Sequence, residues 1–558
     1  MNDIPVQRGF QEAIAAAFPM SRAAASVPAA AIGHVRRIAG GAGELVLDGA
    51  ALATLRTQPD ATLAMAGQVG GQLKVRVGAA WLIATIRALR LADAVDGCVI
   101  ADVDFLGEGD EERLTGRLYH FRRGVTCYPT PGTAVFAVTG NDLREIYTAA
   151  GRAAIEIGHV HPTRDVRASL YVDAMLGKHF ALLGSTGTGK STATALILHR
   201  ICQQAPQGHV VMIDPHGEYG AAFGEAGALF DVSNLQMPYW LMNFEEHCEV
   251  FVTSSGATRQ VDADILAKCL LAAKARSRAG QEIAKLTVDV PIPYLLSDLT
   301  QILQQEMGKM DRAGDTSPYL RLKNKIDEIK ADPRYGFMFS GLLVADTMAA
   351  FVQRIFRLPG DGRPVSIIDV SGVPSEITSV VVAVLARMVF DFAIWSRGEA
   401  QRPILLVCEE AHRYIPADAD ARSSVARILG RIAKEGRKYG VALGLVTQRP
   451  SDLSEGVLSQ CGTIIAMRLN NDRDQAFVRA AMPEGARGFL DTLPALRNRE
   501  AIVCGEGVSI PIRVAFDTLE DDRRPASDDP VFSALWRDSG GEEQMIARTL
   551  QRWRAQGR

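Results

Sequence analysis

The sequence lacks closely spaced cysteines. Its eight cysteines stand at positions 98, 127, 202, 248, 269, 408, 461 and 504, and none forms a CxxC pair. This spacing argues against a zinc site and against a disulfide framework. Several of the cysteines lie inside apolar runs, which is typical of buried thiols in a reducing compartment. We therefore expect a cytoplasmic protein.

A strong net charge and a long uninterrupted apolar segment are also missing. The net charge of −3 argues against a uniformly basic coat for nucleic acid but leaves room for a local basic channel. The most apolar stretch, Ile377 to Trp395, is interrupted by Arg387 and Asp391, so we expect no membrane span. Near the N-terminus, Glu12 and Arg22 flank a short alanine-rich run, which does not match a secretory pattern.

A chain of 558 residues is too long for one hydrophobic core, so two to four domains are expected. Residues 1–25 are expected to form a helical or loose leader. Residues 26–150 contain several short β-like runs separated by glycine-rich turns, such as Gly40-Gly41 and Gly70-Gly71. This pattern predicts a small closed β-barrel or sandwich. Residues 151–172, of mixed polarity, are predicted to be a linker.

From about residue 173 the pattern alternates between strands and helices. The alternation predicts an α/β core with a largely parallel sheet covered on both faces, over residues 173–244 and 346–515. Residues 245–345 interrupt it with helix-like, charge-rich segments and are predicted to be a helical insertion. Residues 516–558 are acidic and then amphipathic, which suggests a tail that embraces a neighbouring molecule. The predicted core strands are 179–183, 209–213, 364–369, 403–408, 441–447, 463–467 and 500–504.

One motif carries the strongest chemical information. The pattern G-x-x-x-x-G-K-[ST] is met between the apolar strand Phe180 to Leu183 and a helix-compatible segment. In such a P-loop, backbone N–H groups and the helix N-terminus hold phosphates, the lysine reaches the outer phosphates and the following hydroxyl ligates Mg²⁺. The predicted nucleotide-binding residues are Gly184, Ser185, Thr186, Gly187, Thr188, Gly189, Lys190, Ser191 and Thr192, with Ser191 at the metal.

A P-loop enzyme also needs carboxylates for the metal and for the attacking water. Three predicted strands end in acidic residues: Asp214, Asp369, and the adjacent pair Glu409-Glu410. Only the third supplies two neighbouring carboxylates. We therefore assign Glu409 to the Mg²⁺ shell and Glu410 to the orientation of water. The alternative is that the pair decorates a helix N-terminus to suit its dipole.

Two further features follow Glu410. Gln448 ends the predicted strand 441–447 and is expected to contact the γ-phosphate or the water, unless it only caps a turn before Arg449-Pro450. Between them, residues 422–438 carry six basic side chains, four of which share one helical face. This helix is either a solvated surface helix or an interface helix that delivers an arginine to the phosphates of a neighbour.

Taken together, these motifs resemble the HerA family of hexameric DNA-translocating ATPases, relatives of FtsK-type pumps. The resemblance covers residues 170–515 and rests on five blocks of sequence. They are Leu176 to Ser191 (LGKHFALLGSTGTGKS), Asp214 to Tyr219 (DPHGEY), Glu409 to Pro416 (EEAHRYIP), Glu435 to Gly440 (EGRKYG) and Thr447 to Ser451 (TQRPS). The N-terminal β region is similar to the family's barrel, and the resemblance implies a RecA-like core.

The resemblance implies several residue roles. Arg437 would be an arginine finger that acts on a neighbouring subunit, and Lys178 stands where the family places a basic residue close to the nucleotide. The barrel would join subunits and dock a partner, while the insertion and inner loops would contact DNA. For the DNA contacts the chain offers Lys268, Lys274, Arg276, Arg278, Arg321 and Lys323, although each one alone is better explained by a solvated helix face.

The resulting hypothesis is a homohexameric, ATP- and Mg²⁺-dependent motor that moves along double-stranded DNA. Family members work with a nuclease such as NurA in DNA end processing, or with a defence effector such as a nuclease or a sirtuin-type NADase. An alternative is a nucleotide-regulated ring scaffold that assembles an effector with little translocation. A conjugative or secretion pump is a third possibility, against which the lack of a membrane segment argues.

Overall fold

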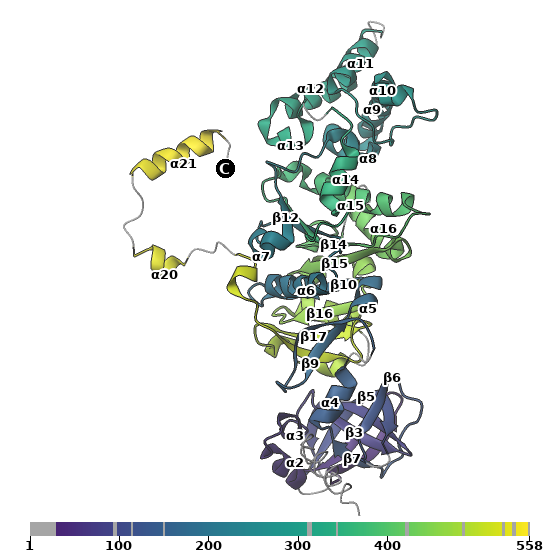
Figure 1. The fold of residues 1–558 in the computed structure, drawn as a ribbon, viewed down its shortest axis with the longest axis vertical. Helices are drawn as coiled ribbons and strands as arrows, with labels where there is room; N and C mark the ends of the chain where they lie inside the picture. Colours follow the sequence, from purple (N-terminus) through teal and green to yellow (C-terminus); the bar gives the residue numbers. More distant parts are fainter. Residues whose placement is uncertain are drawn as a thin grey trace, which may run out of the picture. The chain divides into compact units, whose positions relative to one another are not determined.

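The structure, a computed structural model, describes residues 30–92, 97–112, 115–148, 151–309, 315–341, 344–418, 423–482, 486–526, 531–537 and 543–555. The predicted leader, 1–25, lies outside the described residues. The chain divides into two compact units between Ile146 and Tyr147, close to the predicted end of the β domain (Figure 1).

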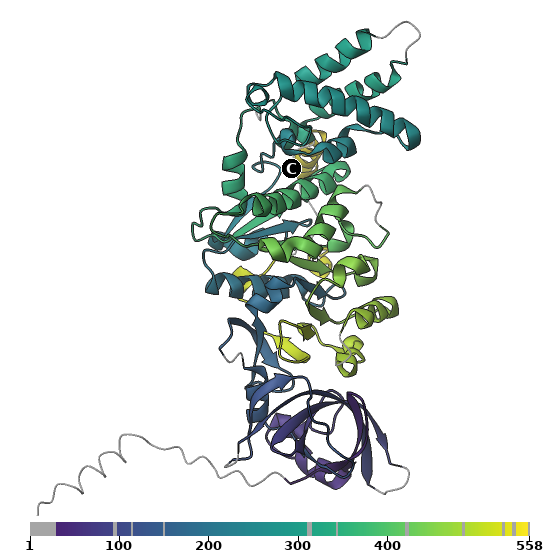
Figure 2. The same cartoon turned by 90° about the vertical axis from the view of Figure 1, so that its right-hand side faces the viewer.

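The first unit is a closed β-barrel, as predicted. Its strands are β1 (Gly33–Ala39), β2 (Ala42–Asp48), β3 (Gln72–Val77), β4 (Ala80–Leu91), β5 (Cys98–Glu111), β6 (Leu118–Arg123) and β7 (Ala134–Ala137). The hydrogen-bonded order is β2-β1-β7-β3-β4-β5, and pairing of β2 with β5 closes the ring, while β6 is added to β5. Figure 2 shows this ring of strands. Helices α2 (Gly49–Arg56), α3 (Ala61–Ala64) and α4 (Gly140–Tyr147) accompany it.

The barrel is filled by the inward side chains of its strands, including the fully buried Leu45, Val75 and Val103. The buried Lys74 on β3 pairs with Asp142 on α4 at 2.8 Å, which fastens that helix to the barrel. Strand β6, which contains mainly exposed side chains, was not predicted, because it lacks the alternating apolar pattern that marks a half-buried strand.

The second unit is built on an eleven-stranded sheet in the order β12-β13-β11-β14-β15-β10-β16-β17-β18-β8-β9. The strands from β12 to β16 run parallel, and the others are antiparallel. This arrangement confirms the predicted fold class. The strands are β8 (Ala154–Val160), β9 (Arg167–Tyr171), β10 (Phe180–Leu183), β11 (Val210–Asp214), β12 (Gly227–Phe230), β13 (Val365–Asp369), β14 (Ile404–Cys408), β15 (Val441–Thr447), β16 (Thr463–Met467), β17 (Glu500–Gly505) and β18 (Ile512–Phe516).

Every residue of the central strands β10, β11, β14, β15 and β16 is buried, so both faces of the sheet are covered. The covering helices include α5 (Val172–Gly177), α6 (Lys190–Gln204), α14 (Met348–Phe356), α15 (Ser375–Trp395) and α16 (Ser424–Tyr439). Helix α15 has the length and hydropathy of a membrane span, but most of it is buried in the core. Its Arg387 bonds Glu246 at 2.8 Å and Asp391 at 3.1 Å, which explains how the interrupting charges are accommodated.

Two parts of the sheet differ from the prediction. The segment 151–172, predicted to be a linker, contains β8 and β9, which join the sheet through β18. Strands β12 and β18 were not predicted either. Both β8 and β12 contain glycines and alternate only briefly, so a purely local pattern does not separate them from loops.

Residues 245–345 form the predicted helical insertion, and no strand occurs in the part of it that the structure describes. Its main helices are α8 (Phe244–Phe251), α9 (Gly256–Arg276), α10 (Arg278–Gln281), α11 (Leu296–Gly308), α12 (Ser317–Ala331) and α13 (Gly336–Phe339), with the short η3 (Pro333–Tyr335). The remaining helices are α7 (Gly220–Phe223), η1 (Gly224–Ala226), η2 (Tyr239–Leu241), η4 (Ala411–Arg413), η5 (Pro450–Asp452), α17 (Glu455–Leu458), α18 (Asp472–Ala481), α19 (Arg487–Leu490), η7 (Leu493–Ala495), η8 (Asp521–Arg523), α20 (Phe532–Leu535) and α21 (Glu543–Ala555).

Candidate active site

The P-loop connects the carboxyl end of β10 to the first turn of α6. Gly187 and Gly189 adopt φ angles of 76° and 99°, which side chains with a Cβ rarely adopt. A Cβ on Gly184 would lie 2.8 Å from the Cβ of Met467 on β16. The loop therefore needs glycine both for its backbone conformation and for its close packing on the neighbouring strand.

Lys190 begins α6 and is buried. Its Nζ donates to the carbonyl of Ser185 at 3.2 Å, and the hydroxyl of Thr188 donates to the same carbonyl at 2.8 Å. Burial lowers the pKa of Lys190, while the carboxylates of Glu409, Glu410 and Glu218 oppose this effect. A buried ammonium group held by a loop carbonyl is suited to receive an anion, as a phosphate-binding lysine must.

Ser191 and Thr192, in the first turn of α6, are half-buried. The hydroxyl of Tyr219 is buried beside Ser191, and burial raises its pKa well above the ordinary value. Tyr219 is held by Asp214, which accepts hydrogen bonds from the N–H groups of His216, Gly217 and Tyr219. Asp214 thus shapes the turn after β11, in agreement with its predicted place near the site and not at its centre.

Glu409 follows β14 and is 5 % exposed. Its Oε2 is buried without a hydrogen-bond partner. Burial, followed by the charge of Glu410, raises the pKa of Glu409 to about 8 although Lys190 acts in the opposite direction. A buried carboxylate oxygen without a partner requires a cation or a proton.

The residues present therefore fit a Mg²⁺ ion that is shared with a nucleotide. Mg²⁺ prefers oxygen ligands and is commonly held by one or two protein oxygens together with phosphate and water. Ser191 and Glu409 could supply the protein oxygens. In the part of the chain that the structure describes, no cluster of three or more acidic, histidine or cysteine ligands forms a metal site of its own.

Glu410 lies between two histidines from different strand ends. Its backbone has a φ of 51°, an unusual conformation for a residue other than glycine. The Nδ1 atom of His412 is 3.2 Å from Oε2 of Glu410, and the Nε2 atom of His216 is 3.8 Å from Oε1. The carboxylate is thus flanked by His216, which follows β11, and by His412, which follows β14.

Gln448 follows β15 and contacts the P-loop directly, because the hydroxyl of Thr186 bonds its Oε1 atom. The preceding Thr447 shares a hydrogen bond of 2.9 Å with Nδ1 of His412. His412 therefore connects the strand that carries Gln448 to the carboxylate of Glu410. The predicted residues of the P-loop, the carboxylate pair and Gln448 thus gather at one edge of the sheet.

Lys178 and Arg437 do not join them. Lys178 precedes β10 and Arg437 is in the last turn of α16 before β15, so both are at the amino ends of parallel strands. Strands advance by about 3.3 Å per residue, which separates Lys178 from Gly184 by roughly 20 Å. Lys178 pairs instead with Glu506 at 2.8 Å. Lys178 is therefore far from the P-loop of its own chain, and its binding to a nucleotide stays a prediction.

The sequence alone gave no role to His412, His216 or Tyr219. All three belong to the sequence blocks around Asp214 and Glu409. The unusual polarity of these loops at strand ends is the sequence feature that could have indicated a functional role for them. The sequence does not reveal the contact between the two segments. His412 and Thr447 share a hydrogen bond although they are 35 residues apart in the chain.

Comparisons with known proteins show what the chain is similar to. The family model described as "Helicase HerA, central domain" matches residues 155–389. The DNA double-strand break repair helicase HerA of Pyrococcus furiosus is 27 % identical over 483 residues, covering 80 % of this chain and 84 % of the relative. The protein of the same name from Saccharolobus solfataricus is 24 % identical over 425 residues, covering 73 % and 77 %.

Among solved structures, VirB4 of Thermoanaerobacter pseudethanolicus aligns with a TM-score of 0.50 at 13 % identity, covering 66 % of this chain and 97 % of that one. This likeness supports the fold of the core alone. The P-loop and the buried carboxylate pair, together with these matches, indicate a P-loop ATPase. The chain is similar to HerA helicases, with the match to their central domain lying over residues 155–389.

Proposed function

We propose that the protein is a cytoplasmic, Mg²⁺-dependent ATPase that assembles into a homohexameric ring and moves along double-stranded DNA. Its partner would be a nuclease or a defence effector. The relatives named as double-strand break repair helicases support action on DNA. The residues gathered at the P-loop support hydrolysis.

Each residue has a defined task in this proposal. The P-loop amides and Lys190 bind the phosphates, and Ser191 and Glu409 hold the metal ion, which neutralises phosphate charge when it is bound. Glu410 orients and deprotonates the attacking water. Gln448, which touches the P-loop through Thr186, contacts the γ-phosphate.

The observation that carries the ring proposal is the position of Arg437. Its exposed side chain makes no hydrogen bond or ion pair within the described parts of the chain. It is separated from Gln448 by the length of β15, which is roughly 23 Å at 3.3 Å per residue. Arg437 therefore cannot reach the phosphates of its own P-loop. An adjacent subunit that presents this edge would place Arg437, together with Lys178 from the same sheet edge, at its neighbour's nucleotide.

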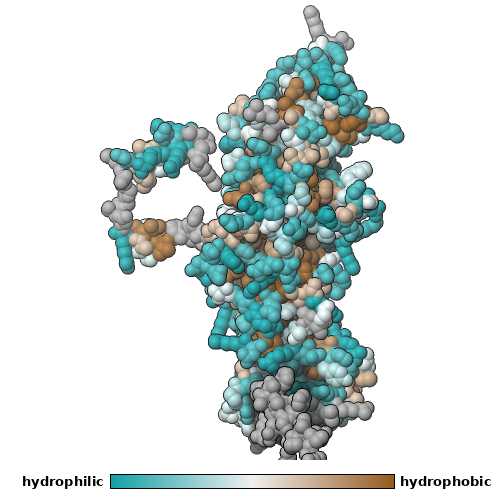
Figure 3. All heavy atoms as spheres, in the orientation of Figure 1, coloured by the Kyte–Doolittle hydropathy of each residue, from teal (hydrophilic) through white to brown (hydrophobic). Residues whose placement is uncertain are grey.

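The C-terminal helices supply a second surface for assembly. Helix α20 and the residue that follows it expose Phe532, Leu535 and Trp536, which appear as a concentration of apolar side chains in Figure 3. Helix α21 exposes Ile546 and Trp553. Exposed apolar surface of this kind usually meets a partner. We propose that the tail braces a neighbouring subunit, and that the barrel joins subunits and docks the effector.

For the DNA contact, the insertion offers fewer residues than the sequence suggested. Lys274 is fully buried and donates to the carbonyls of Val288 and Val290, so it is excluded as a DNA contact. Arg278 is highly exposed although it pairs with Glu282 at 3.6 Å, and Lys268 and Arg321 pair with Glu306 and Asp262. Contacts from exposed basic side chains to the phosphate backbone would give a grip that is independent of sequence and weakened by salt.

The test combines ATP turnover with a strand- or protein-displacement assay on double-stranded DNA. We expect DNA to stimulate ATP hydrolysis, and Lys190→Ala or Glu410→Gln to remove it, while Glu376→Gln, an exposed carboxylate on α15, keeps it. Full turnover in both site variants would contradict the site. The scaffold alternative would be favoured if DNA does not change ATP turnover and if the activity of the effector depends on the ring but not on ATP hydrolysis.

A further inference from the structure

Arg499 lies beside the P-loop, on the flank opposite to Gln448. Strand β10 pairs with β15 on one side and with β16 on the other, and β17 runs antiparallel to β16. The residue that precedes β17 is therefore at the same sheet edge as the P-loop. Gln448 approaches the loop from the β15 side, whereas Arg499 approaches it from the side of β16 and β17.

The contacts of Arg499 with the P-loop are close. Its backbone N–H donates to the carbonyl of Thr188 at 3.0 Å. Its Cγ lies 3.3 Å from the position that a Cβ on Gly189 would occupy. The side-chain stem thus packs against the last glycine before Lys190.

The backbone of Arg499 is in the left-handed region, with a φ of 65°. Residues with a Cβ rarely adopt this conformation, and such residues concentrate at functional sites. Glycine would satisfy the same backbone without strain. An arginine therefore occupies a position at which the backbone conformation alone would favour glycine. This suggests that the arginine side chain has a function.

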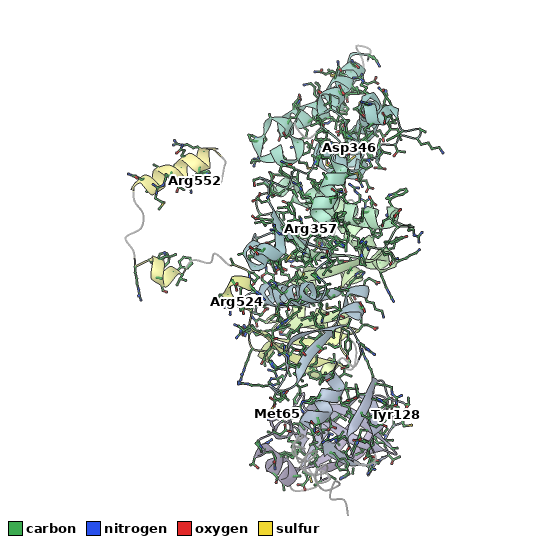
Figure 4. All side chains as sticks on the ribbon, in the orientation of Figure 1. Met65, Tyr128, Asp346, Arg357, Arg524 and Arg552 are labelled. Carbon is green, nitrogen blue, oxygen red and sulfur yellow. The ribbon has the colours of Figure 1, made fainter. Side chains whose placement is uncertain are left out.

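The guanidinium group is exposed and has one hydrogen bond among the described residues, from Nη1 to the hydroxyl of Thr518 at 2.7 Å. Its other N–H groups remain available to a ligand. Thr518 begins a segment, residues 518–526, that we name the strap. It contains Arg524, labelled in Figure 4, and its Ala526 donates to the carbonyl of Glu218 in the turn after β11.

The direction of a bound nucleotide follows from the catalytic residues. Glu410 and Gln448 follow β14 and β15, so the γ-phosphate must be on that side of the loop. The phosphate chain then passes along the loop, and the α-phosphate and nucleoside leave on the other side. That is the flank occupied by Arg499. A guanidinium group is suited to this position because it forms directed, charge-assisted hydrogen bonds with phosphate oxygens.

We propose that Arg499 binds the α-phosphate of the nucleotide in its own chain. This inference rests on the proposed nucleotide site but adds a residue to it. Arg499 acts in binding, at the far end of the phosphate chain from Glu410 and Gln448. Its loss weakens nucleotide affinity and raises KM for ATP, and it has little effect on kcat.

Calorimetric titration of the full-length protein with ADP tests the proposal. Loss of a charge-assisted hydrogen bond corresponds to about tenfold to hundredfold weaker binding. We expect this loss in Arg499→Gly, whose backbone fits the left-handed conformation, and in Arg499→Gln. Arg499→Lys keeps the charge and should remain within about threefold of wild type. Equal ADP affinity in wild type and Arg499→Gly would overturn the proposal.

Two controls separate a direct contact from an effect on the shape of the loop. Thr518→Val removes the hydrogen bond to the strap but keeps Arg499, so its ADP affinity should match wild type. A loss as large as that of Arg499→Gly would show that the strap is responsible, against the proposal.

Inorganic pyrophosphate, which has no nucleoside end, should bind wild type and Arg499→Gly alike when it occupies the outer phosphate positions. Parallel loss of pyrophosphate binding would mean a distorted P-loop and would overturn the direct contact. If wild type itself fails to bind ADP, the proposed function fails instead.

Discussion

At the scale of single residues, burial decides what a charged side chain can do. Lys274 illustrates this, because its ammonium group is buried in the insertion and bonded to two carbonyls, Val288 and Val290. Burial, with a smaller contribution from Arg387, lowers its pKa to about 8, while Asp289 acts in the opposite direction. The same residue type at Lys268 is exposed on the same helix and paired with Glu306.

The lowered pKa of Lys274 predicts a pH dependence of stability. Between about pH 8 and 10.5 the folded chain has released this proton and the unfolded chain still holds it, so the free energy of unfolding rises with pH. Below pH 8 both states are protonated and the burial penalty is present in full. In Lys274→Met this rise should be absent. The free energy of unfolding of wild type should therefore increase by up to about 3 kcal/mol relative to that of the variant over this pH range.

Urea unfolding followed by tryptophan fluorescence measures this difference, since Trp240 is buried in the core cluster that includes the insertion helices. Groups that titrate in both proteins cancel in the comparison. Lys268→Met is the matched control. Its free energy of unfolding should change with pH as that of wild type does between pH 8 and 10.5. The same pH dependence in Lys274→Met and wild type would contradict the lowered pKa of Lys274.

At the scale of elements, helix α16 is fixed near both ends by hydrogen bonds to neighbouring elements. Ser424 at its start donates from N and Oγ to Glu249 on α8, at 2.6 and 3.0 Å. Near its end, the buried His179 accepts from the N–H of Leu443 at 2.9 Å and its Nε2 meets the carbonyl of Ala433 at 3.1 Å. Nδ1 must accept from Leu443, so Nε2 carries the proton and donates.

This geometry predicts that His179 positions Arg437. In an α-helix the carbonyl of Ala433 also pairs with the N–H of Arg437, so His179 supports the turn that carries that arginine. We expect His179→Ala to lower kcat for ATP by about tenfold, as small displacements of a catalytic group do. ADP affinity should change little. Hydrogen exchange over residues 433–439 should become faster.

A double variant decides whether this effect passes through Arg437. If it does, adding His179→Ala to Arg437→Ala should not reduce kcat further, because the group that His179 positions is already missing. Additive losses of the two substitutions would contradict the positioning role and would indicate general destabilisation.

At the scale of the whole molecule, the active site is expected to be shared between subunits. Mixing Arg437→Ala with Lys190→Ala subunits, each inactive alone, should then restore ATP hydrolysis. With random assembly in equal amounts, up to about a quarter of the shared sites would combine an intact P-loop with an intact arginine. Steady-state ATP turnover in mixed rings, with mixing shown by native mass measurement, checks this.

The matched control mixes Lys190→Ala with Glu410→Gln. Both residues belong to the same half of the site, so no interface in such a ring is complete and activity should stay absent. Recovery in this control, or no recovery in the first mixture despite mixed rings, would argue against a site completed by Arg437 of a neighbour.

The sequence determined the features that depend on local pattern. The P-loop, the acidic pair Glu409-Glu410 and the buried parallel strands could all be predicted, because glycine spacing, strand-end carboxylates and continuous apolar runs are readable from neighbouring residues. The helical insertion and the barrel followed from the same kind of pattern.

Tertiary structure alone decided which residues meet across long separations. It joined β8 and β9 to the core sheet, buried Lys274, moved Lys178 to the edge opposite the P-loop, and brought His412 to Thr447 and Arg499 to Gly189. The physical reason is that strand order and direction set which strand ends share an edge, and neither is encoded in a local window of sequence. Composition indicates a charged side chain, but packing determines whether it meets solvent, a carbonyl or a phosphate.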